Sequence, residues 1–167
     1  RRQRQMCIRD RANPLAPNYI TQGVTTLVVG NCGISAAPLS KDSKELINLI
    51  LPPQFKEKIK INWSSFEKYL KEVEKSKLAV NIAPLLGHNT IRSYVLGLGD
   101  NKVTSNELNE MKELIREAME AGAFGLSTGL IYDPGVFAKS DEIIELAKVV
   151  SEYGGSMHLI YGMNQIF

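Results

Sequence analysis

A glycine-entered apolar run near the amino end limits the fold of this chain more than any other stretch. Residues 23–29 read Gly-Val-Thr-Thr-Leu-Val-Val and are rich in β-branched side chains. Such a run is typical of a strand in a parallel sheet that is buried on both faces, where the alternation of apolar and polar residues disappears. We therefore predict a strand at Thr25–Val29 in a protein of the α/β class.

A tight turn carrying a thiol, Gly30-Asn31-Cys32-Gly33, follows this strand directly. Its two glycines let the backbone turn sharply and approach another group closely. The Cys32 thiol is thereby presented at the carboxyl end of a strand, where α/β barrels carry their chemistry. Judged from these residues alone, a lone cysteine in such a turn is more often a buried structural residue than a reactive one.

The rest of the chain alternates between helical periodicity and short apolar runs. Ser64 with Glu67 and Thr104 with Glu107 have the spacing of capping boxes, and each pair predicts a helix start. Ser140 is expected to cap a further helix. The predicted helices are 64–77, 91–96, 104–121 and 140–153, with a short one at 40–51. The predicted later strands are 78–86, 123–126 and 156–160.

The inward faces of two of these helices follow from apolar spacing. We expect Leu108, Met111, Leu114, Ile115 and Met119 to face the core from the helix at 104–121. In the helix that begins at Ser140, Ile143, Ile144, Ala147 and Val150 are expected to face inward. The segment Gly87–Thr90 is expected to be a turn at the carboxyl end of its strand.

The order of these elements favours right-handed βαβ units, which build a parallel sheet covered by helices. Periodicity alone leaves an open doubly wound sheet and part of a barrel as alternatives. The chain contains neither the GxGxxG nor the GxxxxGK[ST] pattern, which removes support from nucleotide-binding versions of the fold.

Length and composition exclude several classes of protein. The 167 residues are too few for a complete (β/α)8 barrel, which takes about 250 residues. A net charge of +2 gives no sign of a basic surface for nucleic-acid binding. No apolar run approaches the ~20 residues of a membrane span. Two cysteines, Cys7 and Cys32, make no disulfide framework, so a reduced, cytoplasmic setting is the expectation. We expect neither nucleic acid nor membrane as a partner.

The run GVTTLVVGNCGISAAPL at residues 23–39 resembles the signature of the N-acyl-D-amino-acid deacylases, or D-aminoacylases, of the metal-dependent amidohydrolase superfamily. The resemblance continues through residues 80–97, 122–135 and 153–155 and covers about residues 13–155. It implies a partial (β/α)8 TIM-type barrel. It also implies that Cys32 is a zinc ligand, which reverses the interpretation of this cysteine as purely structural.

The resemblance implies a hydrolase that acts on carbon–nitrogen bonds other than peptide bonds. Such an enzyme cleaves the amide bond of an N-acyl-D-amino acid to a carboxylate and a free D-amino acid. Zn²⁺ would lower the pKa of a bound water and polarise the carbonyl group. Two alternatives stay open: a cyclic amidase of the dihydroorotase or hydantoinase type, and a half-barrel remnant without catalytic activity.

Most of the metal site that the family requires is missing from this chain. The pattern needs a His-x-His pair, two later histidines and a late aspartate as general base, whereas the chain has only His88 and His158. His158 lies two residues before the family's histidine position, where this chain has Ile160. It is a metal ligand if the strand is shortened, and an accidental histidine otherwise. We therefore expect an internal fragment, with the general base outside it.

Three further residues match family segments and are candidate substrate-binding residues. His88 lies in Gly-His-Asn-Thr-Ile-Arg, and Ser127 and Tyr132 lie in a loop that resembles the family's STGLxYxPG segment. His88 is equally compatible with a structural hydrogen bond, and Tyr132 with a buried, hydrogen-bonded side chain. Ser127 lacks the G-x-S-x-G surroundings of a serine nucleophile.

The predicted organisation has three parts. Residues 1–11 resemble no part of the family and are expected to be non-native or disordered, the alternative being a basic arm for an anionic partner. Residues 12–160 are the partial amidohydrolase barrel, and residues 161–167 form a divergent tail. We expect the isolated chain to bind zinc weakly, if at all, and to lack deacylase activity.

Overall fold

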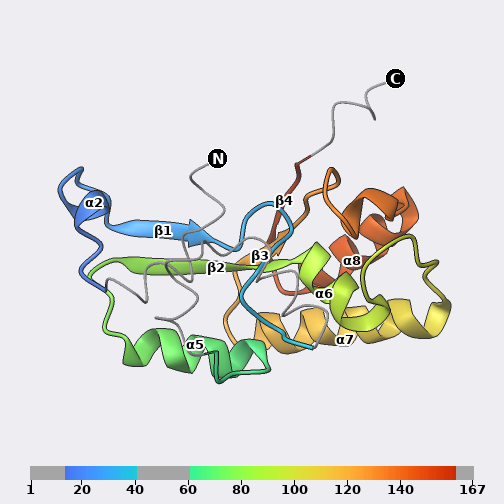
Figure 1. Ribbon diagram of the computed structural model, residues 1–167, viewed down its shortest axis with the longest axis horizontal. Helices are drawn as coiled ribbons and strands as arrows, with labels where there is room; N and C mark the ends of the chain where they lie inside the picture. Colours follow the sequence, from blue (N-terminus) through green and yellow to red (C-terminus); the bar gives the residue numbers. More distant parts are fainter. Residues whose placement is uncertain (1–13, 41–60, 161–167) are drawn as a thin grey trace.

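The computed structural model describes residues 14–40 and 61–160 (Figure 1). Several predictions lie outside these residues. They concern the segment 1–11 with Cys7, almost all of the helix expected at 40–51, and the tail 161–167.

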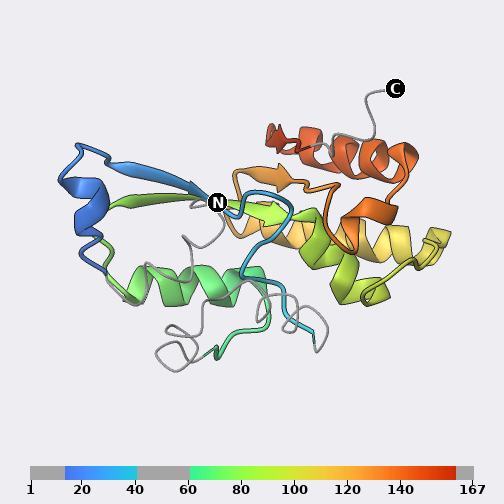
Figure 2. The ribbon, with the colours of Figure 1, turned by 45° about the horizontal axis from the view of Figure 1, so that its top comes forward.

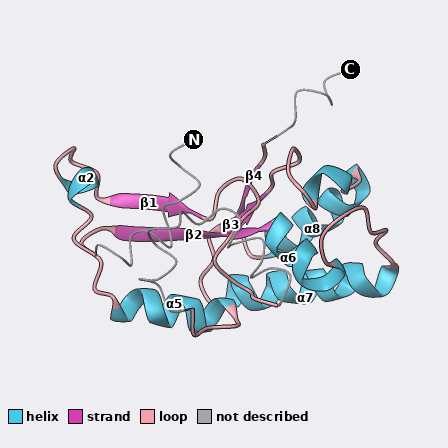
Figure 3. Cartoon of the chain, viewed as in Figure 1, coloured by secondary structure: helices cyan, strands magenta, loops and turns pink. Residues whose placement is uncertain are grey.

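Four parallel strands in sequential order form the sheet (Figure 3). They are β1 (Thr26–Val29), β2 (Asn81–Gly87), β3 (Gly125–Ser127) and β4 (Ser156–His158). Val29 pairs with Pro84, and Ser127 pairs with both Gly87 and His158. The predicted α/β class with parallel strands is therefore confirmed, and the carboxyl ends of the last three strands are in register.

Helices follow the strands as the alternation predicted. The longer ones are α5 (Phe66–Lys75), α6 (His88–Leu96), α7 (Ser105–Glu120) and α8 (Ser140–Glu152), beside the short α2 (Pro17–Ile20) and the 3-10 turn η2 (Gly135–Phe137). Figures 1 and 2 show α5 and α7 along one side of the strands, and α7 packs against both α5 and α8. This alternation of strand and helix is that of one segment of a (β/α)8 barrel.

The main core fills the space between the sheet and the helices. Its centre combines Leu86 and Leu126 from the sheet with Met111 and Ile115 from α7 and Leu146 from α8, all inaccessible or nearly so. Burying a side chain of this size contributes about 1.5–3 kcal/mol. The sheet is therefore anchored to its helices by apolar packing, which fixes the strand ends that carry the candidate site.

The strand β1 differs from the prediction, because only one of its faces is buried. Leu27 and Val29 are buried, whereas Thr26 and Val28 are exposed. Within the described residues β1 pairs only with β2, so it is an edge strand. One of its two faces is also exposed. An unbroken apolar run therefore did not mean burial on both sides here.

Helix α7 starts as predicted, with a complete Thr104–Glu107 capping box. Helix α5 does not, because Ser65 and not Ser64 is its N-cap and accepts from the backbone nitrogen of Lys68. The backbone carbonyl of Ser64 instead accepts from Leu39. The predicted serine was one position early, since two consecutive serines offer the same capping chemistry.

Helix α8 departs further from the prediction. Its N-cap is Lys139, without a side-chain cap bond, and Ser140 is the first helical residue. Its buried residues are Glu142, Leu146, Val149 and Val150, whereas Ile144 is 52% exposed. The buried face of α8 therefore differs from the predicted one, because the inward stripe begins with a buried carboxylate, Glu142, and not with an apolar residue.

The expected turn at Gly87–Thr90 is also wrong in part, since α6 begins at His88 immediately after β2. In helix α7, Met111, Ile115 and Ala118 are buried, and Leu108, Leu114 and Met119 pack partly buried against the core.

Among the described residues, no helix is long and apolar enough to cross a membrane.

Candidate functional site

Loops from three neighbouring strands meet at the carboxyl edge of the sheet. The first is the turn Gly30–Gly33 after β1, the second is the start of α6 after β2, and the third is the segment Thr128–Tyr132 after β3. The backbone nitrogen of Thr90 donates to the carbonyl of Gly33 at 3.2 Å, which ties the first loop to the second. The edge is thus a single connected unit.

Cys32 lies in this turn in a backbone conformation that is rare for a side chain. Its φ is +62°, and the flanking Gly30 and Gly33 have φ of +82° and +76°. The left-handed region costs a non-glycine residue roughly 1–2 kcal/mol. Such outliers persist where the surroundings fix them, and they cluster at functional sites. Cys32 is also buried, with 8% of its surface exposed.

Close packing explains why glycines surround Cys32. A side chain at Gly30 would meet the carbonyl of Leu85 at 2.1 Å, and one at Gly129 would meet the carbonyl of Cys32 at 2.1 Å. The turn after β1 is therefore pressed between β2 and the loop that follows β3. This contact brings Cys32 next to the loop that carries Tyr132.

Two buried polar side chains bond to these loops. The hydroxyl of Ser127 accepts from the backbone nitrogen of Gly33 at 3.0 Å and donates to the carbonyl of Gly30. The Asn89 amide donates from Nδ2 to the carbonyls of Gly129 and Tyr132 at 3.1 and 3.4 Å. Both side chains are fully buried.

His88 lies at the start of α6 and points to a carboxylate. Its Nε2 lies 2.7 Å from Oε1 of Glu142 on α8, and both residues are buried. The Nε of Arg92 lies 3.5 Å from the same oxygen, and Nη2 donates to the carbonyl of Asn101 at 2.7 Å. His88 Nδ1 is buried without a partner in the structure described. His88 thus belongs to a buried imidazole–carboxylate–guanidinium cluster.

His158 ends β4 and is half-buried. Its Nε2 lies 3.2 Å from the hydroxyl of Ser156, and its backbone carbonyl accepts from Thr128. Within the described ranges, no group of three or more histidine, cysteine, aspartate or glutamate side chains is placed to hold a metal ion. Cys32 and His158 therefore offer donor atoms for a metal, without a complete set around either.

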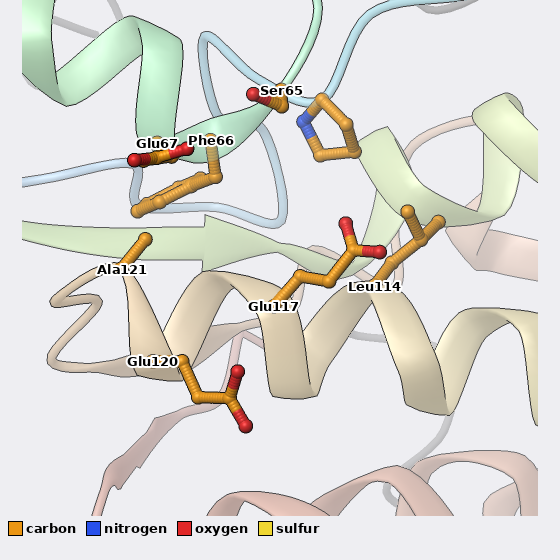
Figure 4. Close-up of a pocket in the computed structure, with 8 residues that line it drawn as sticks. Ser65, Phe66, Glu67, Leu114, Glu117, Glu120 and Ala121 are labelled. Carbon is orange, nitrogen blue, oxygen red and sulfur yellow. The ribbon is translucent and has the colours of Figure 1, made fainter.

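Two surface pockets lie among the helices. The first, of about 370 Å³, lies between the first turn of α5 and the side of α7, where Figure 4 shows Phe66 next to Ala121, with Glu117 and Leu114 further along α7. The second, of about 510 Å³, is bordered by Arg92, Glu142 and the first turn of α7. None of the predicted site residues, Cys32, His88, Ser127, Tyr132 and His158, lines either pocket.

Sequence comparison relates this chain to deacylases of D-amino acids. It is 36% identical over 148 residues to the N-acyl-D-aspartate deacylase of Alcaligenes xylosoxydans xylosoxydans, covering 88% of this chain and 29% of that protein. It is 39% identical over 136 residues to the D-aminoacylase of the same organism, covering 81% of this chain and 27% of that protein. No family model matches the chain.

Solved structures point the same way. A D-aminoacylase studied for its binuclear metal centre superposes with a TM-score of 0.77 and 31% identity, over 92% of this chain and 31% of that one. The N-acyl-D-glutamate deacylase of Bordetella bronchiseptica was solved with zinc and a phosphonate mimic of the tetrahedral intermediate. It superposes with a TM-score of 0.76 and 30% identity, over 88% of this chain and 30% of that one. The chain belongs to the N-acyl-D-amino-acid deacylase family.

This deacylase-family chain spans less than a third of the length of the relatives that it matches. The match agrees with the partial amidohydrolase barrel expected from the sequence. Metal centres are described for solved family structures, in one case with zinc. The roles of individual residues in this chain stay predictions.

Sequence reasoning missed two buried polar residues near this edge of the sheet, Asn89 and Glu142. Asn89 had a usable signal, since it follows a predicted strand directly in a segment that resembles the family. Glu142 had none, because an acidic residue in the first turn of a helix is explained by the helix dipole alone. Its partner His88 is 54 positions away in the chain.

Proposed function

We propose that this chain is part of a zinc-dependent amidohydrolase that cleaves N-acyl-D-amino acids to a carboxylate and a free D-amino acid. The observation that carries the proposal is Cys32, buried in a left-handed turn at the carboxyl edge of a parallel sheet. The similarity to N-acyl-D-amino-acid deacylases, one of them solved with zinc and an intermediate mimic, supports it.

Cys32 would donate its thiolate to the metal from the end of β1. Thiolate, imidazole and carboxylate are the donors that zinc accepts, and the fit of this chain to zinc is partial because one buried thiol is its main contribution. When bound, zinc supplies an activated water and polarises the scissile carbonyl group. The remaining ligands and the general base would come from family segments outside the match, with His158 as a further candidate ligand.

The other residues would act around the thiol. Tyr132 lies in the loop that packs against Cys32, which favours a contact to the acyl or carboxylate group of the substrate. His88 is fully buried and bonded to Glu142, which favours support of the edge over direct substrate contact. For Ser127 the sequence predicts a substrate contact, and the cytoplasmic location is likewise a prediction from the sequence.

The two alternatives make different predictions. A cyclic amidase would open a ring amide, but the relatives described above are deacylases of open-chain N-acyl-D-amino acids by name, which favours the first proposal. A non-catalytic remnant would share the fold without needing the Cys32 thiol.

A chimera tests the proposal. The matching segment of the Alcaligenes D-aminoacylase is replaced by residues 14–160 of this chain, and hydrolysis of N-acetyl-D-methionine, N-acetyl-L-methionine and dihydroorotate is measured. We expect turnover of the D-substrate alone and its loss in the Cys32→Ser chimera. Turnover of dihydroorotate would support the cyclic amidase, and D-substrate turnover unaffected by Cys32→Ser would contradict the role of this residue.

A further inference from the structure

One hydroxyl group closes the turn that carries Cys32. Ser127 is fully buried at the end of β3, and its Oγ accepts a hydrogen bond from the backbone nitrogen of Gly33 at 3.0 Å. The same hydroxyl donates its proton to the carbonyl of Gly30. Gly30 and Gly33 are the two ends of the turn, so a single side chain from a neighbouring strand fixes both.

Cys32 needs such a support because of its backbone conformation. A φ of +62° is disfavoured for a residue with a side chain. Without an external constraint, the turn would relax towards conformations in which the thiol no longer has a defined position. Flexible glycines on both sides would make that relaxation easy.

The loop after β3 completes the enclosure. The backbone of Gly129, two residues after Ser127, lies so close to the carbonyl of Cys32 that a side chain there has no room. Asn89 holds this loop through the Gly129 carbonyl. The Cys32 turn is therefore locked from β3 by a hydrogen-bonded clamp and by close backbone packing.

We propose that Ser127 is a positioning residue that holds the Cys32 turn in its left-handed conformation and so fixes the thiol for metal binding. The metal part of this statement rests on the proposed function, whereas the positioning of the thiol does not. Since the single proton of the hydroxyl goes to Gly30, Ser127 has none to donate to a substrate. The proposal therefore assigns it a role different from the substrate contact expected from the sequence.

Thiol reactivity tests the clamp without any metal. In the full chain with Cys7→Ser, Cys32 is the only thiol, and its alkylation by iodoacetamide is measured under native conditions. We expect Ser127→Ala to raise the alkylation rate about tenfold, the factor that corresponds to 1.4 kcal/mol. This is the order of one or two lost hydrogen bonds.

The matched control is Thr128→Val, the adjacent buried hydroxyl, which has no hydrogen-bond partner in the described structure. It removes a hydroxyl from the same loop without touching the turn, and we expect less than about a twofold change. Equal effects of the two substitutions on alkylation would mean general loosening and would overturn the proposal. Unfolding midpoints of both variants show whether stability alone explains a difference.

Hydrogen exchange keeps the proposal testable if Ser127→Ala does not fold. In the unsubstituted chain, the Gly33 amide should exchange at least about a hundredfold more slowly than a free amide, because it donates to a buried hydroxyl. Exchange at the free rate would overturn the clamp. Co²⁺ added to the Alcaligenes chimera, which supplies the remaining ligands, separates the two claims: a thiolate charge-transfer band that Ser127→Ala weakens supports both, whereas a clamped turn without such a band in the chimera contradicts only the metal role.

Discussion

At the scale of single residues, His88, Arg92 and Glu142 form a buried cluster of ionisable side chains. Oε1 of Glu142 lies 2.7 Å from Nε2 of His88 and 3.5 Å from Nε of Arg92. All three side chains are almost inaccessible to water. Burying charges is expensive, and removing one partner of a buried pair leaves the other uncompensated. The cluster joins α6 to α8 just behind the loops that hold Cys32.

We predict that Glu142→Gln lowers the free energy of unfolding by about 3–5 kcal/mol, because the guanidinium of Arg92 loses its buried counter-charge. Urea denaturation measures the change. The control is Glu145→Gln, one turn further along α8, where the carboxylate is partly exposed and the cost should be much smaller. Equal losses of unfolding free energy for the two substitutions would show that the His88–Arg92–Glu142 cluster is not the main stabiliser of the contact between α6 and α8.

Sequence reasoning could locate Cys32 but not its environment. Two glycines around a cysteine after an apolar strand are a local pattern, and they predicted a turn at a strand end. The hydrogen bonds that fix this turn come from Ser127, and Asn89 holds the neighbouring loop through Gly129. Both residues lie more than 50 positions further along the chain. Such pairings depend on the strand order, which local periodicity does not contain.

At the scale of elements, caps and ion pairs decide where helices start and how they pair. Thr104 and Glu107 form a complete capping box, Ser65 caps α5 with one bond, and Ser140 makes no cap bond. Between α7 and α8, Glu145 binds Lys112 at 2.7 Å, and within α8 it binds Lys148 at 2.5 Å.

Substitution of the caps should follow the structure and not the sequence pattern. Thr104→Ala and Ser65→Ala are each expected to cost about 1 kcal/mol, because each leaves a backbone nitrogen of the first turn without its acceptor. Ser140→Ala should have an effect near zero. Thermal unfolding of the three variants checks this, and a cost for Ser140→Ala as large as that for Thr104→Ala would contradict the assigned start of α8.

The Glu145 pair gives a pH dependence of known sign. Hydrogen bonds from Lys112 and Lys148 and their charges lower the pKa of Glu145 from 4.5 to about 2. A carboxyl whose pKa is lowered on folding stabilises the protein above its unfolded pKa and loses this contribution as the pH falls through the folded value. We expect Glu145→Gln to lower the unfolding midpoint at pH 7, with the gap closing between about pH 4.5 and 2. A gap independent of pH would contradict the ion-pair explanation.

At the scale of the whole molecule, the described part is a four-stranded parallel sheet with β1 and β4 at its edges. Its class and order were predictable, because alternating strands and helices permit few topologies. The open face of β1 was not, because burial depends on what lies opposite a strand. The same holds for the metal site, since Cys32 supplies one donor and the relatives are about three times as long as this chain.

For the 167-residue chain alone we predict no measurable deacylase turnover. Catalytic zinc sites use three protein ligands, whereas this chain has two histidines, of which His88 is taken up by Glu142. An assay with N-acetyl-D-methionine and added zinc measures this. Zinc-dependent turnover that Cys32→Ala abolishes would show that the chain holds a complete site.

The most direct test of the claim that Cys32 is a metal ligand measures Co²⁺ binding by the Alcaligenes chimera that carries residues 14–160 of this chain. With Co²⁺ in place of zinc, coordination by Cys32 should give a thiolate charge-transfer band, and Cys32→Ser should remove the band and lower metal affinity by at least about tenfold. Retention of the band and of full metal affinity in Cys32→Ser would contradict the assignment of Cys32 as a metal ligand.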